Sequence, residues 1–206
     1  MRRLGGLFAA FLVTASLFGG WSAHATVALK LSVEDMAREA AVVVRAQARA
    51  HMSAWDESHR RIYTYTELEV LETWAGEADS TVVVRTLGGE VDGVGMKVSG
   101  VARFEDGEEV VLFLRTDPAH EAELTVVGMS QGKLRIAREG EKTLAVPQAG
   151  GLVLAVRRGD GRIDMTENAG QAALPIADLR ARVETARVQI PTLDQPSTNP
   201  ATPVTK

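Results

Sequence analysis

The sequence predicts a mainly β protein: a small closed or partly open antiparallel barrel, with a short helix leading into it and a C-terminal helix after it. Three observations predict this class. Short runs rich in Val, Leu and Ile recur at hairpin spacing and are separated by Gly-rich or acidic turns. Aromatic residues make up only 5% of the chain, so its core is built from aliphatic side chains. Closing the sheet hides the edges that a flat sheet of Val-rich strands would expose.

The first helix is expected from about Val33 to Ala40 or Ala41, after an extended lead-in at 26–31. Ser32 suits the N-cap, and Asp35 stands where its carboxylate completes a capping box. The strands follow as β-branched or alternating runs that end at turns. We expect them at 41–48, 61–74, 81–87, 108–115, 123–128 and 133–138, with shorter strands at 144–146 and 152–156.

Two connections and the closing helix complete the expected chain. A polar hairpin loop is expected at 55–60, and the segments 123–128 and 133–138 are expected to pair around Ser130. Pro175 opens the closing helix, which presents one apolar face formed by Ile176, Leu179, Val183 and Ala186. This order favours a partly open, OB-like Greek-key barrel as one domain over 26–190, with an open β-sandwich as the alternative.

The first 25 residues predict export. Arg2 and Arg3 give a positive start, an apolar run follows, and Ala23-His24-Ala25 matches a small-x-small cleavage site. This pattern is typical of a secretory signal peptide, and its apolar run is too short and Gly-rich for a stable membrane span. We expect 1–25 to be removed and the mature protein to be periplasmic or extracellular; a retained N-terminal anchor is the alternative.

The end of the chain differs in composition from the rest. Residues 191–206 hold four of the seven prolines, interleaved with Thr, Ser, Asn and Gln. Such a composition buries too little apolar surface to fold, so we expect a disordered Pro- and Thr-rich tail.

Charge and composition exclude several classes of function. The 23 basic side chains less Arg2 and Arg3 leave 21 against 27 acidic ones, a formal charge of −6 that argues against nucleic acid or anionic lipid as partner. Cysteine is absent, which excludes disulfides and thiol chemistry. His51, His59 and His120 are expected in loops, too scattered for a zinc site, and no metal or other cofactor is predicted.

Two glycine-containing motifs have both a functional and a structural interpretation. Gly128-Met129-Ser130-Gln131-Gly132 matches the pattern of a hydrolase nucleophile elbow, but an elbow runs into a helix, and here a strand is expected to follow. We therefore interpret it as a hairpin turn, predict no catalytic residue, and keep a serine hydrolase using Ser130 as an alternative. The Gly-rich stretch Gly93-Val94-Gly95-Met96 leads into an extended segment instead of a helix, unlike a phosphate-binding loop. We expect a wide crossing of the barrel or a mobile surface loop that contacts a partner.

Five segments carry a resemblance to an uncharacterised family of exported bacterial proteins; they are 36–45, 63–71, 84–90, 104–114 and 127–133. This resemblance implies a shared fold and export, and no assigned activity.

Three features also resemble, more distantly, the netrin-like OB-fold domain of tissue inhibitors of metalloproteinases. They are the strand Val42–Ala46, the long strand ending in Trp74-Ala75-Gly76, and the strand Glu109–Leu114. The resemblance implies that the free α-amine and first carbonyl of Thr26, with Val27 following, chelate the zinc of a protease. Those inhibitors fix their N-terminus with disulfides, which a chain without Cys lacks.

The leading prediction is an exported, non-enzymatic domain that binds another extracellular or periplasmic protein. Its sharpest version is an inhibitor or partner of a zinc metalloprotease, and the candidate contacts are Thr26, Val27, Gly93, Val94, Gly95 and Met96. The alternative is a ligand-binding or structural module of the cell envelope, suggested by the polar tail joined to a compact domain.

Overall fold

The computed structural model describes residues 26–117, 120–148, 151–157, 159–166 and 172–188. The leader at 1–25 and the tail at 191–206 lie outside these described residues, so both stay predictions. Strands account for 55% of the structure and helices for two short segments, which confirms the mainly β class.

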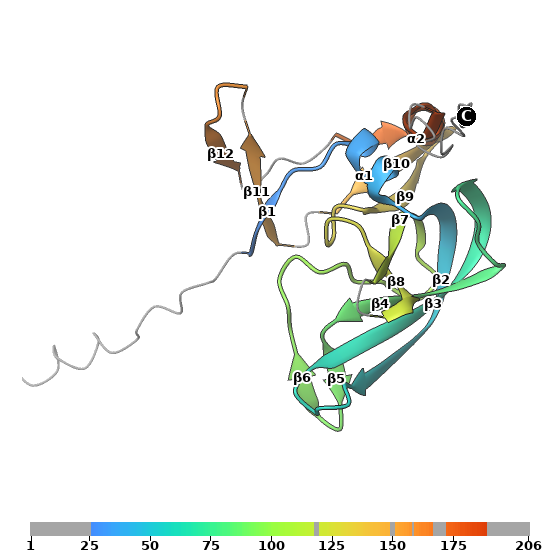
Figure 1. Cartoon of the computed structure of the whole chain (residues 1–206). Helices are drawn as coiled ribbons and strands as arrows, with labels where there is room; N and C mark the ends of the chain where they lie inside the picture. Colours follow the sequence, from blue (N-terminus) through green and yellow to red (C-terminus); the bar gives the residue numbers. More distant parts are fainter. Residues whose placement is uncertain (1–25, 118–119, 149–150, 158, 167–171, 189–206) are drawn as a thin grey trace, which may run out of the picture.

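Five strands form the predicted barrel: β2 (Val42–Trp55), β3 (Ile62–Ala75), β4 (Thr81–Leu87), β7 (Glu109–Asp117) and β8 (His120–Val126). The ring runs from β7 through β2, β3, β4 and β8 back to β7. Its neighbours are antiparallel except β4 and β8, which pair in parallel at one position. The ring is therefore only partly closed along that seam, as expected for an OB-like barrel (Figure 1).

Three further strands continue the sheet from the other end of β7: β9 (Lys133–Glu139), β10 (Lys142–Pro147) and β13 (Leu174–Pro175). The helices α1 (Val33–Glu39) and α2 (Ile176–Val188) lie together over this part of the sheet (Figure 1). Both helices match the predicted leading and closing helices.

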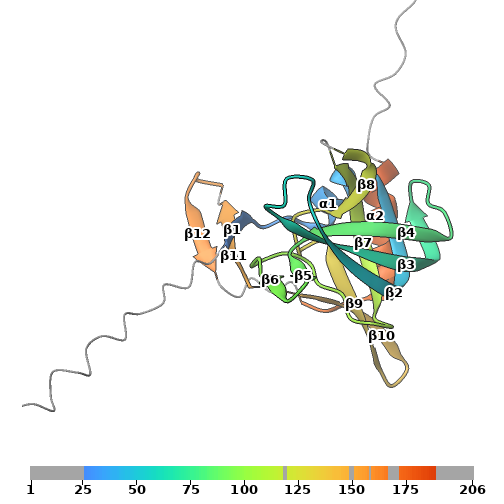
Figure 2. The same cartoon turned by 90° about the horizontal axis from the view of Figure 1, so that it is seen from below.

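Two small sheets stand outside the barrel. The first joins β1 (Thr26–Leu29), β11 (Leu152–Arg157) and β12 (Ile163–Thr166), with β1 parallel to β11, and lies to one side of the barrel in both views (Figures 1 and 2). The second is a hairpin of β5 (Gly89–Val91) and β6 (Val94–Met96) that follows β4. Sequence reasoning found the residues of β1 and β11 but not their pairing.

The expected hairpin between 123–128 and 133–138 is wrong. β8 and β9 pair instead with successive parts of the same edge of β7, through Leu114↔Val126 and Leu112↔Lys133. The turn between them is held to β7 by its own backbone, because Val127 N–H donates to Phe113 O and Phe113 N–H donates to Gly132 O.

Two expected loop positions are also wrong. β2 continues to Trp55, so the hairpin loop covers 56–61 and His51 lies on a strand. His120 begins β8 instead of lying in a loop. His59 does lie in the loop, where its ring stacks on Trp55.

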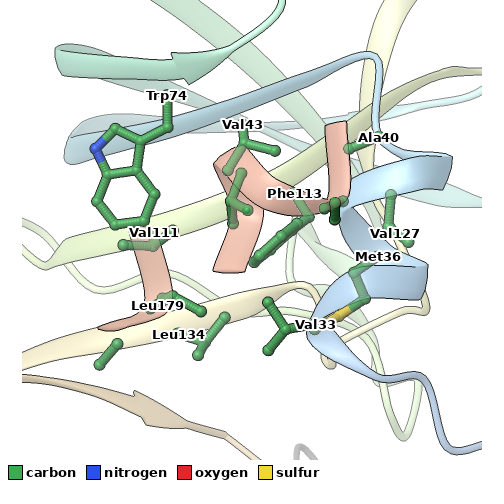
Figure 3. Packing of buried hydrophobic residues seen from close by; sticks show 14 of the residues in the cluster. Val33, Met36, Ala40, Val43, Trp74, Val111, Phe113, Val127, Leu134 and Leu179 are labelled. Carbon is green, nitrogen blue, oxygen red and sulfur yellow. The ribbon is translucent and has the colours of Figure 1, made fainter. Parts of the chain in front are cut away.

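Both faces of β2 and β7 are buried, which explains their continuous apolar runs. Val42 and Val44 point into the barrel while Val43 points toward the helices, and β7 alternates in the same way. The barrel core is formed mainly by Val42, Val44, Ala46, Leu68, Val82, Val84, Leu112 and Leu114. The second core lies between the sheet and the helices, with Met36, Val43, Trp74, Val111, Phe113, Leu134 and Leu179 in contact (Figure 3).

The predicted cap fixes the start of α1. Asp35 N–H donates to Ser32 Oγ over 3.0 Å, and Ser32 N–H donates to Asp35 Oδ2 over 3.2 Å, which completes the capping box. Arg182 of α2 then binds the Glu34 carboxylate through two hydrogen bonds of 2.7 and 2.8 Å, and these hold the pKa of Glu34 below its ordinary value. The two helices therefore pack as one unit.

Candidate functional site

A cleft of about 520 Å³ opens at one end of the barrel. β2 pairs with β7 over Val42–Gln47 and then continues beside β3 as far as Trp55. The long β2–β3 hairpin thus extends beyond the sealed part of the barrel. Its inner face, the end of β4, the β5–β6 hairpin and the segment 102–104 line the cleft.

The floor of the cleft is the polar continuation of the barrel interior. Ala48 and Leu68 form the apolar pair that borders the cleft on the inner face of β2 and β3. The next inward pairs are His51↔Thr66 and Ser53↔Thr64, and Thr86 of β4 lies opposite Thr64. The barrel interior therefore changes from aliphatic to hydroxyl-rich as it reaches the cleft.

A β-bulge brings His51 to this face. The register of β2 against β3 shifts between Ala48 and Ala50, so Arg49 is the extra residue. Because strand side chains alternate, an unbroken β2 would send the third residue after Ala48 to the outer face. The bulge reverses this parity. Sequence reasoning missed His51 because the bulge leaves no local signal.

Hydrogen bonds hold the floor in place. His51 Nδ1 lies 3.0 Å from Thr66 Oγ1, and its Nε2 lies 2.9 Å from Asp106 Oδ1. Ser53 Oγ lies 2.9 Å from Thr64 Oγ1, which donates to Gly88 O over 2.7 Å. His51 thus tethers the turn before β7 to the floor.

The contacts of His51 place a hydroxyl, an imidazole and a carboxylate in a row, as a hydrolytic triad does. Thr66, however, is only 1% exposed, whereas Asp106 has a side chain that is 81% exposed. A nucleophile must reach its substrate, and a solvated carboxylate orients an imidazole weakly. This row of contacts is better suited to fixing the cleft than to attacking a carbonyl.

The β5–β6 hairpin forms one wall. Asp92 and Gly93 connect its strands with φ values of 51° and 77°, the combination of a type I′ turn. A Cβ at Gly89 would collide with the hydroxyls of Ser53 and Thr64, so glycine lets the hairpin fold over the floor. The segment is therefore a tight hairpin instead of the expected wide crossing of the barrel.

The predicted contact residues fall in different places. Gly95 and Met96 line the cleft, whereas Gly93 and Val94 form the tip of the hairpin. Thr26 and Val27 lie in β1, which is part of the separate sheet well away from the hairpin (Figure 1). The structure thus brings Gly95 and Met96 to a recess and leaves Thr26 and Val27 elsewhere.

The opposite wall of the cleft depends on a buried lysine. Lys133 is 1% exposed, and its Nζ donates to Glu108 Oε2 over 2.7 Å, to Gln148 Oε1 over 3.0 Å and to Arg103 O. Burial lowers the pKa of Lys133 below its ordinary value. The ammonium also lies 4.9 Å from the centre of the Phe104 ring. Lys133 therefore fixes the segment that carries Arg103 and Phe104.

A second polar cluster closes the seam between β4 and β8. The Asp117, His120 and Glu123 side chains place their possible ligand atoms within 4.8 Å of one another, a spacing that a metal ion could use. Arg85 already meets all three: it pairs with Asp117, lies 2.7 Å from Glu123 Oε2 and 3.3 Å from His120 Nδ1. Arg85 is 9% exposed, so these buried ion pairs link β4 to β7 and β8 across the seam.

The Ser130 motif lies in the turn between β8 and β9, and no helix follows it. Ser130 is 2% exposed, and its Oγ has no hydrogen-bond partner among the described residues. The segment is a turn, as expected, but not a hairpin turn, because β8 and β9 both pair with β7. Gln131 beside it has a structural role, because its side chain donates to Leu29 O and accepts from Leu31 N–H, each over 2.9 Å.

Comparison with protein-family models and with curated proteins finds no match to this chain. None of the described helices is long and apolar enough to cross a membrane.

Proposed function

We propose that this chain is an exported, non-catalytic domain that binds another protein, with the cleft as its contact surface. The observation that supports this most is the construction of the cleft. Its floor is held by internal hydrogen bonds, while Glu90, Gly95 and Lys97 on its border are exposed. Small-molecule pockets enclose most of their ligand, so an open recess with exposed borders suits a macromolecule better.

Site-specific cross-linking tests this proposal. A photoreactive residue at Met96 reports on the cleft, and one at Val83, which is 48% exposed on the outer face of β4, is the matched control. In cells that export the protein, we expect a discrete adduct with one protein from Met96 and none from Val83. Absence of an adduct at Met96, or the same adduct at both positions, would contradict a specific contact at the cleft.

A second candidate is the metalloprotease inhibitor. It is favoured by the way the start of the described chain is held without disulfides. Thr26 pairs with Leu152 in a parallel ladder, and Gln131 binds the backbone of Leu29 and Leu31. These contacts lower the entropy cost of presenting Thr26 to a zinc ion, a cost of roughly 1–2 kcal/mol for each residue ordered.

An inhibition assay with two forms of the N-terminus tests the inhibitor hypothesis. Protein that begins at Thr26 is compared with protein carrying one extra Met before Thr26, against a panel of zinc proteases. Inhibition by the first form alone is expected, because chelation needs the free α-amine of Thr26. Inhibition by neither form, or by both equally, counts against the idea.

A further inference from the structure

The outer edge of β6 presents unused backbone groups beside the cleft. In a hairpin with a two-residue turn, the residues next to the turn exchange hydrogen bonds, and the following pair does not. Val91 and Val94 are that first pair, so the next pair, Glu90 and Gly95, is not hydrogen-bonded. The N–H and C=O of Gly95 therefore point away from β5.

This edge is accessible. Within the described part of the chain, β6 pairs with β5 alone. Gly95 is exposed, and no atom lies within 4 Å of where its Cβ would be. Edge strands are usually blunted by charge, by Pro or by a bulge, and the residues of β6 supply none of these.

The charges around the cleft favour an acidic partner. The titratable side chains of its lining are His51, Glu90, Lys97 and Arg103, and His51 is held by Asp106. Lys97 and Arg103 are exposed and form no ion pair with a described residue, so both cations are available to a partner's carboxylates. The acidic side chains at the cleft are Glu90 and Asp106. On a chain with a formal charge of −4, these two unpaired cations are where a carboxylate-rich segment finds counter-charges.

We propose that an extended acidic segment of the partner protein adds a strand to the outer edge of β6. Its backbone exchanges hydrogen bonds with the N–H and C=O of Gly95, and its carboxylates meet Lys97 and Arg103. This inference rests on the proposed function, since it specifies what the cleft binds.

Two substitutions at Gly95 isolate the backbone contact. Gly95→Pro removes the outward N–H without taking a hydrogen bond from β5, a position where an edge strand accepts Pro. Gly95→Ala keeps the N–H and adds a methyl group where space is open. The probe is a phage-displayed library of short linear peptides selected on the wild-type protein. We expect acidic peptides to be enriched, Gly95→Pro to weaken their Kd about tenfold, and Gly95→Ala to change it by less than about twofold.

A second measurement keeps the test decisive if Gly95→Pro misfolds. Hydrogen exchange at the Gly95 amide of the wild-type protein slows at least about tenfold on peptide binding if that N–H gains a partner. An unchanged exchange rate with bound peptide, or equal binding by a folded Gly95→Pro variant, overturns strand addition. Failure to select any peptide overturns it too.

Charge reversal completes the test. Lys97→Glu with Arg103→Glu is expected to weaken peptide binding more than tenfold, whereas Lys142→Glu, at the distant β9–β10 turn, leaves it unchanged (Figure 1). Equal effects of the two changes overturn the acidic assignment.

If Met96 still cross-links one protein when these tests fail, the cleft remains a binding surface and only the strand-addition mode is lost. If cross-linking also fails, both proposals fall.

Discussion

The two halves of the barrel's inner face share β2 and β3 and differ in chemistry. In the sealed half, Val44 of β2 and Leu112 of β7 are fully buried in an aliphatic core. In the open half, β2 and β3 continue without β7 and carry His51, Ser53 and Thr64 on that face. One half excludes water with apolar packing, and the other holds a hollow shape with hydrogen bonds.

This difference shows how the β2–β3 hairpin can both stabilise the barrel and form a cleft. The sealed half supplies the hydrophobic stabilisation, so the open half does not need to fill its own space. The bulge at Arg49 separates the two halves, since it reverses which side chains face inward. Stability should therefore depend on the sealed half and on Lys133, while the shape of the cleft should depend on the open half.

The largest effect is expected at the ionic anchor between the halves. Lys133→Ala leaves the buried carboxylate of Glu108 without its cation and should lower the free energy of unfolding by about 3–5 kcal/mol. Urea denaturation measures this, and Lys142→Ala, the same change at an exposed lysine, should alter it by less than about 0.5 kcal/mol. Similar values for the two variants would show that the buried pair is not an anchor.

A core truncation probes the sealed half directly. Leu112→Ala should lower the free energy of unfolding by about 2–5 kcal/mol, because Leu112 is 0% exposed and its removal leaves a cavity. The matched control is Leu71→Ala, where the side chain is 42% exposed. A loss below about 1 kcal/mol for Leu112→Ala would mean that the barrel core carries little of the stability.

The pH dependence of stability isolates the charge of Lys133. Its pKa in the folded protein lies below the unfolded value near 10.5, because burial disfavours the ammonium. Between the two pKa values the unfolded chain binds more protons, so stability should rise with pH as it approaches 10.5. Thermal unfolding of wild type and Lys133→Met across alkaline pH measures the difference. If stability rises with pH by the same amount in both proteins, groups other than Lys133 cause the rise.

The smallest effect on stability is expected in the open half. Thr64→Val removes the hydroxyl that bonds Gly88 O and Ser53 Oγ and should cost about 1 kcal/mol. The same variant should weaken any cross-link from Met96, because the hairpin loses its fixed position over the floor. Thr81→Val, at the exposed start of β4, is the control. A loss as large as that of Leu112→Ala would erase the contrast between the halves.

Local patterns predicted most of the fold. Ser32 and Asp35 predict the start of α1, and the alternation from Ile62 to Val70 predicts β3. Both predictions succeed because helix caps and strand faces depend on residues that are close in sequence. The number and order of strands then favoured a barrel. The prediction failed for the pairing of strands that are far apart in sequence. β8 and β9 both pair with β7, and the turn at Ser130 between them does not indicate this.

The cleft was only half predictable. Gly95 and Met96 were predicted as contacts because loops on rigid scaffolds often carry binding sites, and both line the cleft. His51 was hidden by the bulge, and the anchoring role of Lys133 was hidden because Glu108 and Gln148 reach it from other parts of the chain. Buried charges and bulges are properties of the assembled sheet, so no window of the sequence shows them.

The parallel ladder between β1 and β11 has a consequence for biogenesis. Thr26 finds its partner Leu152 only after more than half of the chain has been made. Until then the residues of β1 lack their ladder partner and stay open to proteolysis. Once β11 arrives, the same residues become part of a sheet and are withdrawn from proteolysis.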